Sequence, residues 1–179
     1  MTKTEIIKEK TACFAGNAIT RRKDEHYSFL NVGKLNLNSD EDYEKFTKML
    51  YKEITIAIEN GYDTFLMTLE SVFEIMAAEL IYDAQQEYDH LDIKLIGVIL
   101  PNQGSEPEYY LDKHWKGRYH LAKNYCKHFV AIEDIPDDAE HINHRVSFTF
   151  KHSSLSFMCF PLSMYIESEE GMKTIPIPL

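Results

Sequence analysis

The residues Gly61–Pro101, GYDTFLMTLESVFEIMAAELIYDAQQEYDHLDIKLIGVILP, follow the order of a strand, a sharp turn, a helix and a second strand. The short apolar run Asp63–Thr68 predicts the first strand, and Ile93–Leu100 is apolar on both faces, which is typical of a central parallel strand covered by helices. Between them, apolar residues recur at the spacing of one helix face: Phe73, Met76, Ala77, Leu80, Ile81 and Ala84. A unit of this kind usually presents a ligand at its first turn, here Thr68–Val72.

Strands and helices alternate along the rest of the chain. Strands are expected at Thr11–Ala15, Asp63–Met67, Ile93–Leu100, Phe129–Glu133 and Leu155–Phe160. Right-handed crossovers between them leave one mainly parallel sheet as the arrangement. The tail KTIPIPL contains two prolines, which confine any strand there to an edge of the sheet. The expected fold class is therefore α/β, a three-layer domain with a mainly parallel sheet and helices on both faces.

The helix before the second strand has both of its ends marked in the sequence. Ser39, with Asp42 three residues on, makes a start that is similar to a capping box, and Gly61 is suited to end the helix. A further helix is expected around Leu111–Tyr125. These elements complete the strand-helix alternation that the sheet requires.

Length and composition predict one domain, residues 1–179. The chain is 44% hydrophobic and 12% aromatic, enough for one substantial core and too short for two ordinary domains. No apolar run reaches the ~18 residues that span a bilayer, and the start MTKTEIIKEK lacks the apolar core of a secretory signal. We therefore expect a soluble, cytoplasmic protein without membrane contact. Cys13, Cys126 and Cys159 are expected to be buried structural thiols.

The charge of the chain argues against nucleic acid as a partner. The net charge is -10, from 29 acidic and 19 basic residues, and no basic face of useful size is visible. The acidic clusters SDEDYE, EDIPDDAE and ESEE are solvated surface or a surface for a basic protein partner. The eight histidines match no metal-ligand signature, and no catalytic set or cofactor motif is apparent.

The segment AAELIYDAQQEYDHLDIKLIGVILP, residues 77–101, resembles the YpsA-like family of the SLOG superfamily, Rossmann-like proteins related to the DprA and LOG groups. In that family an Ala-Ala-Glu helix, an acidic-tyrosine helix end and an apolar strand closing on proline occur in this order. TACFAG resembles its opening strand and glycine, RYHLAKNYCKHFVAIED its Arg-Tyr helix and next strand, and NHRVSFTFKHSSLSFMCF its last helix and strand. The resemblance runs from about Thr11 to Phe160 and implies a nucleotide-binding fold.

The loops depart from the family pattern. Gly16 keeps the glycine of the first loop, but Asn17-Ala18-Ile19 follows where the family has His-Arg-Pro. In the second loop Leu69 and Val72 stand at glycine positions, while Glu74 keeps an acid near its end. A β-branched Val72 would be strained at positive φ, and Glu70 adds negative charge at the mouth of the site. Two free backbone amides and the helix N-terminus still favour an anion.

These departures predict a degenerate phosphate site. Leu69 or Val72 is expected to point inward, against the first strand near Gly16, because burial of one such side chain is worth roughly 1.5–3 kcal/mol. A surviving ligand would lie further out and be neutral or cationic. The residues expected to line a ligand site are Gly16, Asn17, Thr68, Glu70, Ser71, Glu74, Glu79, Pro101, Asn102 and Arg145.

Two kinds of role remain open for some of these residues. Glu79 is either a helix-edge acid that pairs with a basic neighbour or a ligand-facing carboxylate. Arg118 and Arg145 are likewise surface ion-pair partners or remnants of a ligand-facing set.

Three functions follow from the residues and the resemblance. The first is a non-enzymatic ligand-binding or regulatory protein, descended from a nucleotide-binding SLOG fold and binding a small nucleotide-like ligand. The second is a protein interaction module that uses its acidic surface. The third is a nucleotide-processing enzyme of the LOG type, whose glycine motif and adjacent catalytic arginine and acid pattern are not visible in the chain. The superfamily often self-associates through its helices, which implies a homodimer.

Overall fold

The computed structural model describes residues 5–16, 31–32, 35–37, 39–99, 113–132, 141–159 and 173–177. Within these residues the chain forms a six-stranded sheet and a separate two-stranded one. The large sheet contains β1 (Thr11–Gly16), β4 (Thr64–Met67), β5 (Lys94–Ile99), β6 (His128–Ala131), β7 (Leu155–Cys159) and β8 (Lys173–Ile177). The small sheet pairs β2 (Asn31–Val32) with β3 (Leu35–Asn36) in antiparallel fashion.

All neighbouring strands of the large sheet are parallel, in the order β6-β5-β4-β1-β7-β8. This confirms the parallel sheet predicted from the sequence, including the parallel pairing of β4 with β5, where Thr64 lies opposite Lys94. The tail forms β8 at an edge, the place to which its prolines confine it.

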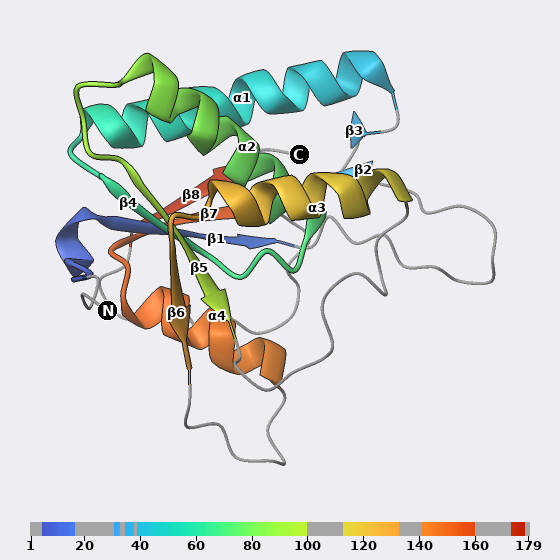
Figure 1. Cartoon of the computed structure of the whole chain (residues 1–179). Coiled ribbons are helices and arrows are strands. Elements are labelled where there is room, and N and C mark those ends of the chain that lie inside the picture. Colours follow the sequence, from blue (N-terminus) through green and yellow to red (C-terminus); the bar gives the residue numbers. More distant parts are fainter. Residues whose placement is uncertain are drawn as a thin grey trace.

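The helices cover both faces of the sheet (Figure 1). They are α1 (Asp40–Glu59), α2 (Val72–Glu87), α3 (Lys113–Tyr125) and α4 (His141–Lys151), and a short 3-10 helix, η1 (Lys8–Lys10), precedes β1. The helices α1, α2 and α3 pack side by side on one face, and α4 packs on the other against β1, β4 and β5. The three-layer α/β fold, with helices on both faces, is therefore confirmed. Across the described ranges, no helix has the length and apolar character that crossing a bilayer requires.

The two ends of α1 differ in how well the sequence predicted them. Ser39 is the N-cap residue, but its side chain makes no capping hydrogen bond, so the capping box expected with Asp42 is wrong. Gly61 follows the last turn with φ of +91°, a conformation that favours glycine, and this end was predicted correctly.

The core lies on both sides of the sheet because the side chains of β1 alternate between its faces. Phe14 lies beneath α1 and α2 and stacks on Phe157 of β7, with ring centroids 4.8 Å apart. Cys13 faces the α4 side, in a cluster with Leu66 and Phe150. All cysteines of the chain are free and buried, as expected, and burial raises the pKa of the Cys13, Cys126 and Cys159 thiols to about 12.

The strand order sets the place where a ligand is expected. From β1 the chain passes to β4 on one side, whereas β7 lies on the other side of β1, so the order reverses between β1 and β7. Open α/β sheets bind ligands at the carboxyl ends of the strands near such a reversal. The turn that joins β4 to α2 lies at the carboxyl ends of the strands, and β4 is the neighbour of β1, where the strand order reverses.

Candidate functional site

The turn between β4 and α2 has an unusual backbone. Leu69 adopts φ of 59°, in the left-handed region, and is alone in this among the non-glycine residues that the structure describes. Val72 is the first residue of α2. The backbone strain that we expected from a positive φ at Val72 is therefore found at Leu69 instead. Leu69 is 3% exposed and Val72 1% exposed, in the same buried cluster as Phe14 of β1. The prediction that an aliphatic side chain of this turn points inward is therefore confirmed.

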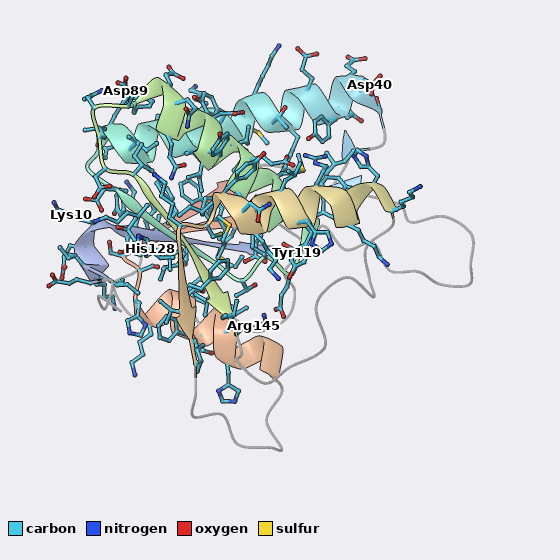
Figure 2. The ribbon with its side chains drawn as sticks, viewed as in Figure 1. Lys10, Asp40, Asp89, Tyr119, His128 and Arg145 are labelled. Atoms are coloured by element: carbon cyan, nitrogen blue, oxygen red, sulfur yellow. The ribbon has the colours of Figure 1, made fainter. Side chains whose placement is uncertain are left out.

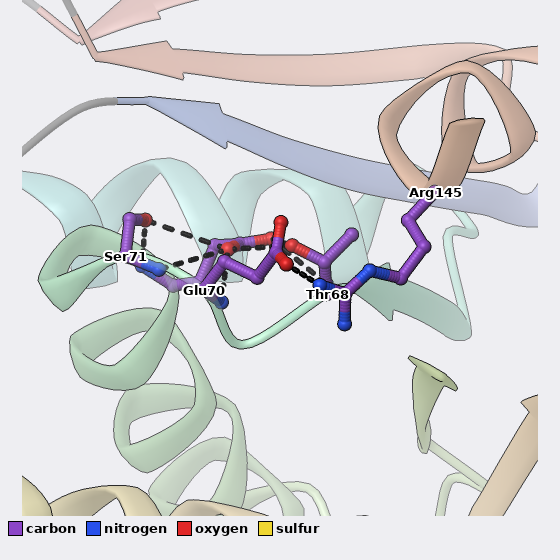
Figure 3. Close-up of polar contacts among 5 residues, drawn as sticks. Thr68, Glu70, Ser71 and Arg145 are labelled. Carbon is purple, nitrogen blue, oxygen red and sulfur yellow. Dashed lines mark hydrogen bonds and ion pairs between the residues drawn. The ribbon is translucent and has the colours of Figure 1, made fainter. Parts of the chain in front are cut away.

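The carboxylate of Glu74 accepts the backbone N–H groups of this turn (Figure 3). Thr68 N donates to Oε1 at 2.8 Å, and Glu70 N and Ser71 N donate to Oε2 at 2.9 and 3.2 Å. The Thr68 hydroxyl also donates to the carboxylate, at 2.9 Å from Oε2. The amides that were expected to be free for an anion are thus already bonded to a carboxylate of the chain itself.

Ser71 and Glu74 form a capping box at the start of α2. The Ser71 hydroxyl oxygen accepts the backbone N–H of Glu74 at 3.2 Å, while the Glu74 side chain accepts the N–H of Ser71. The helix N-terminus therefore has its own acidic partner, which stabilises the positive end of the helix dipole. Sequence reasoning overlooked this role for Glu74, although Ser-x-x-Glu before an apolar helix is the spacing that signals it.

Burial dominates the protonation of Glu74. Glu74 is 4% exposed, and this desolvation raises the pKa of its carboxyl to about 7. The hydrogen bonds from Thr68 and Ser71 act in the opposite direction, because they stabilise the charged form. The chain consequently places a carboxyl that titrates near neutral pH at the position where a nucleotide-binding fold holds phosphate.

Arg145 reaches the turn from α4, on the opposite face of the sheet, and forms an ion pair with Glu70 (Figure 3). The side chains of Arg145 and Glu70 are 10% and 17% exposed. Burial lowers the pKa of Arg145 to about 10, which leaves the guanidinium charged at neutral pH. The negative charge that Glu70 was expected to add at the mouth of the site is thus offset by Arg145.

Glu79 lies in a second cluster, away from the turn, that joins the three helices of one face. Arg118 of α3 donates from Nε to Glu79 Oε1 at 2.8 Å and also donates to the hydroxyl of Tyr43 on α1. The Arg118 guanidinium lies 4.0 Å from the ring centroid of Trp115. Burial acts to lower the pKa of Arg118, but the hydrogen bonds and charge of Glu79 outweigh it and raise that pKa. This cluster ties α1, α2 and α3 together.

The structure brings together half of the residues that the sequence singled out. Thr68, Glu70, Ser71, Glu74 and Arg145 meet at the carboxyl end of β4. Gly16 ends β1, the neighbouring strand, and Glu79 lies in the Arg118 cluster. Asn17, Pro101 and Asn102 lie outside the described residues.

The cluster at β4 draws on helices from both faces of the sheet, because Glu74 belongs to α2 and Arg145 to α4. In Figure 2, Arg145 lies on α4, on the opposite face from the labelled Tyr119 of α3. No group of three or more His, Cys, Asp and Glu side chains within the described ranges is arranged to hold a metal ion.

No family model matches this chain, and no curated protein matches it. The turn, its carboxylate and the ion pair beside it are therefore the features that bear on the function.

Proposed function

We propose that this chain is a non-enzymatic ligand-binding or regulatory protein, a divergent YpsA-like member of the SLOG superfamily whose phosphate-binding turn is occupied by its own carboxylate. The observation that supports this is the set of three backbone N–H groups, of Thr68, Glu70 and Ser71, that donate to Glu74. In nucleotide-binding folds such amides at a helix N-terminus bind phosphate. Here a phosphate would have to displace a buried carboxyl to reach them.

Charge and shape both disfavour a polyphosphate at this turn. A phosphate would meet the carboxylates of Glu70 and Glu74, and the nearby cation, Arg145, is already paired with Glu70. Leu69 and Val72 are buried where glycines would leave room. A ligand at this edge is therefore neutral or cationic rather than a polyphosphate.

The chemistry of the described side chains supports a binding role over an enzymatic one. The thiols of all cysteines are buried, and a pKa of about 12 keeps them protonated, so they are poor nucleophiles. The Ser71 hydroxyl oxygen accepts the Glu74 N–H in the capping box, and the oxygens of Glu74 beside it accept the N–H groups of the turn. The LOG-type enzyme is the weaker alternative for this reason.

A second candidate is a protein interaction module. Leu121 on α3 and Phe129 on β6 are 50% and 42% exposed, although large apolar side chains are more stable when buried. Together with the net charge of -10, they are compatible with a partner that has apolar and basic groups, or with a homodimer. A change of both residues to serine would lower the mass in sedimentation if the chain self-associates through them.

A thermal-shift screen tests the ligand-binding role. Inorganic phosphate, AMP, ADP and ATP should leave the Tm where chloride at equal ionic strength leaves it, whereas an uncharged nucleoside or a small amine should raise it. A ligand at a hundred times its Kd stabilises the fold by about 2.7 kcal/mol, which such a screen detects. Stabilisation by the polyphosphates would overturn the proposal, and a screen without any stabilising compound would leave only the interaction module.

A further inference from the structure

The strand β6 is an open edge of the large sheet. It pairs with β5 on one side, and in the part of the chain that the structure describes no strand pairs with its other side (Figure 1). His128, Phe129 and Ala131 are exposed, whereas the neighbouring strand β5 is buried along most of its length. Backbone N–H and C=O groups along such an edge are a template for another strand. The edge of β6 is therefore presented to solvent and to a partner.

The outward backbone groups of β6 belong to Phe129 and Ala131. In a parallel ladder, alternate residues of a strand direct both their N–H and their C=O to the same neighbour. Ile132 N, just after β6, donates to Ile99 O of β5 at 3.1 Å, so Ile132 and Val130 face β5. Phe129 and Ala131 consequently direct their N–H and C=O groups away from the sheet, one residue on either side of Val130.

The opposite edge of the sheet, at β8, lacks such a complete set of groups. Lys173 N donates to Ser154 O at 3.0 Å, so by the same alternation Thr174 and Pro176 face outward from β8. Proline has no N–H, and this edge therefore offers no donor at Pro176. The strand β6, HFVA, contains neither proline nor glycine. Of the two edges, β6 is the one that can pair with another strand along its whole length.

From this geometry we infer that two copies of the chain form a homodimer in which β6 pairs antiparallel with β6 of the second copy, about a two-fold axis at Val130. Phe129 of each copy then lies opposite Ala131 of the other. Each such pair exchanges two N–H···O bonds, as the hydrogen-bonded pairs of antiparallel strands do. The outward groups are symmetric about Val130, which is what a two-fold interface requires. The inference goes beyond the proposed ligand binding and does not rest on it.

The side chains near the axis permit this pairing. The Phe129 ring lies over Gly97 of its own sheet, where an added Cβ would approach the ring to 2.5 Å, so it leaves the edge open to a second strand. Phe129 and Ala131 share a face of β6, so these apolar side chains meet across the axis. The two Lys127 residues lie at opposite ends of the pairing, roughly 20 Å apart for about six residues of strand. The pairing therefore places no like charges opposite each other along β6.

The dimer is expected to be reversible. A pair of short strands is a small interface, and each copy carries a net charge of -10, which repels the other copy. Added salt screens this repulsion. The proportion of dimer should therefore rise with protein concentration and with ionic strength.

Hydrogen exchange of the unaltered protein tests the contact at single amides. It is followed by NMR at two concentrations, at which sedimentation gives the mass of one copy, 20.9 kDa, and twice that mass. Exchange at the amides of Phe129 and Ala131 should slow at least about tenfold in the dimer, because each gains an acceptor. The amide of Val130 faces β5 in both states and should change by less than about twofold.

A proline variant removes an outward donor from the edge. Ala131→Pro deletes an N–H that faces away from β5, so the pairing of β6 with β5 is kept while each copy loses a donor to the other. The dissociation constant of the dimer, measured by sedimentation equilibrium, should rise at least about tenfold. Thr174→Pro is the matched control, because it deletes an outward N–H at the opposite edge and should leave the dissociation constant unchanged.

Three outcomes would overturn the inference. The first is a single copy at every concentration up to the limit of solubility, in which case the open edge is left for a strand of another protein. The second is a dimer in which the amides of Phe129 and Ala131 exchange as fast as in the single copy, since its contact then lies elsewhere, such as on the helices. The third is an equal effect of the two proline variants. If Ala131→Pro does not fold, the exchange measurement on the unaltered protein decides.

Discussion

The carboxylate of Glu74 accepts the backbone N–H of Thr68 at 2.8 Å, across the turn that joins the end of β4 to the start of α2. The bond spans six residues and brings an acid from the helix back to the strand end. A phosphate in a nucleotide-binding fold receives the same kind of donor from the same place in the fold. In the proposed function Glu74 takes the place of that phosphate, because its carboxyl group accepts these N–H groups and holds the shape of the turn.

Removal of this carboxylate should destabilise the protein. In Glu74→Ala the N–H groups of Thr68, Glu70 and Ser71 lose their acceptor inside a buried turn. We expect a loss of about 2–4 kcal/mol in the free energy of unfolding, measured by urea denaturation at pH 6. Asp83→Ala, which removes an exposed acid from the same helix, is the control and should change stability by less than about 1 kcal/mol. Equal effects of the two changes would contradict the role of Glu74.

The titration of Glu74 should appear in the pH dependence of stability. Its folded pKa of about 7 is above the ordinary value of 4.5, so the folded protein holds this proton more tightly than the unfolded chain. The resulting stabilisation is complete below about pH 4.5 and is lost as the pH rises through 7. Relative to the non-titrating Glu74→Gln variant, the free energy of unfolding should fall by about 2–4 kcal/mol between pH 5 and pH 8.5.

Comparison of the two proteins cancels the titration of groups that do not interact with Glu74. Of the groups near it, Cys13 is coupled to the charge of Glu74, but its pKa of about 12 lies above this pH range, and Arg145, with a pKa of about 10, stays charged across it. If the hydrogen bonds of the turn dominated over burial, the pKa would lie below its ordinary value. The stabilisation by Glu74 would then be complete above about pH 4.5, so the difference between the two proteins would stay constant between pH 5 and pH 8.5, and the assignment of burial as the main cause would be wrong.

Anions should restore part of the stability that Glu74→Ala loses. The variant leaves backbone amides of the turn without an acceptor at a helix N-terminus, which favours an anion. Phosphate should therefore raise the Tm of the variant more than chloride at equal ionic strength, and the wild-type protein should show no such difference. A Leu69→Gly, Val72→Gly double variant that keeps Glu74 should not gain this response, since the carboxylate still holds the amides.

The Arg118 cluster should contribute more to stability than an exposed ion pair. Arg118→Ala leaves Glu79 without its partner at 24% side-chain exposure and removes the contact with Trp115. We expect a loss of about 2–3 kcal/mol in chemical denaturation. Lys48→Ala breaks an exposed pair with Glu44 and should cost less than about 0.5 kcal/mol. Similar losses in both variants would mean that the cluster does not hold the helices together.

The sheet could be predicted from the sequence because each strand is a short apolar run with its own helix pattern beside it. Ile93–Leu100 is an example, since a run whose one polar side chain is Lys94, near its start, fits a strand covered on both sides. The helix end at Gly61 was likewise visible as a local signal. Local patterns of this kind survive into the fold because tertiary packing reinforces them.

The arrangement of the site was less accessible. Glu70 and Arg145 are 75 residues apart, and their contact depends on α4 crossing to the other face of the sheet, which no local pattern specifies. Glu74 was recognised as an acid near the turn, but the sequence was interpreted in terms of a ligand and not of the capping box that the spacing from Ser71 signals. The left-handed backbone at Leu69 was visible only through the glycine that the resembled family has at this position, because leucine itself disfavours that conformation.

The left-handed backbone of Leu69 should reverse the usual stability order of alanine and glycine variants, and a pair of substitutions can measure this reversal. At φ of 59° any residue with a Cβ is strained, while glycine is not. Leu69 nevertheless remains, because its buried side chain offsets the strain. Once the side chain is removed only the strain is left, so Leu69→Gly should be more stable than Leu69→Ala by about 1 kcal/mol, although both are less stable than the wild type.

Leu66 supplies the matched control for this reversal. It is fully buried in β4, three residues before Leu69, and has ordinary strand backbone. There the usual order should hold, with Leu66→Ala more stable than Leu66→Gly by roughly 0.5–1 kcal/mol, because glycine loses more backbone freedom on folding. Urea denaturation of the four variants at one pH gives both differences. If alanine is the better residue at position 69 as well, the turn does not hold its left-handed conformation, and the amides of Thr68, Glu70 and Ser71 are not fixed in the arrangement that Glu74 closes.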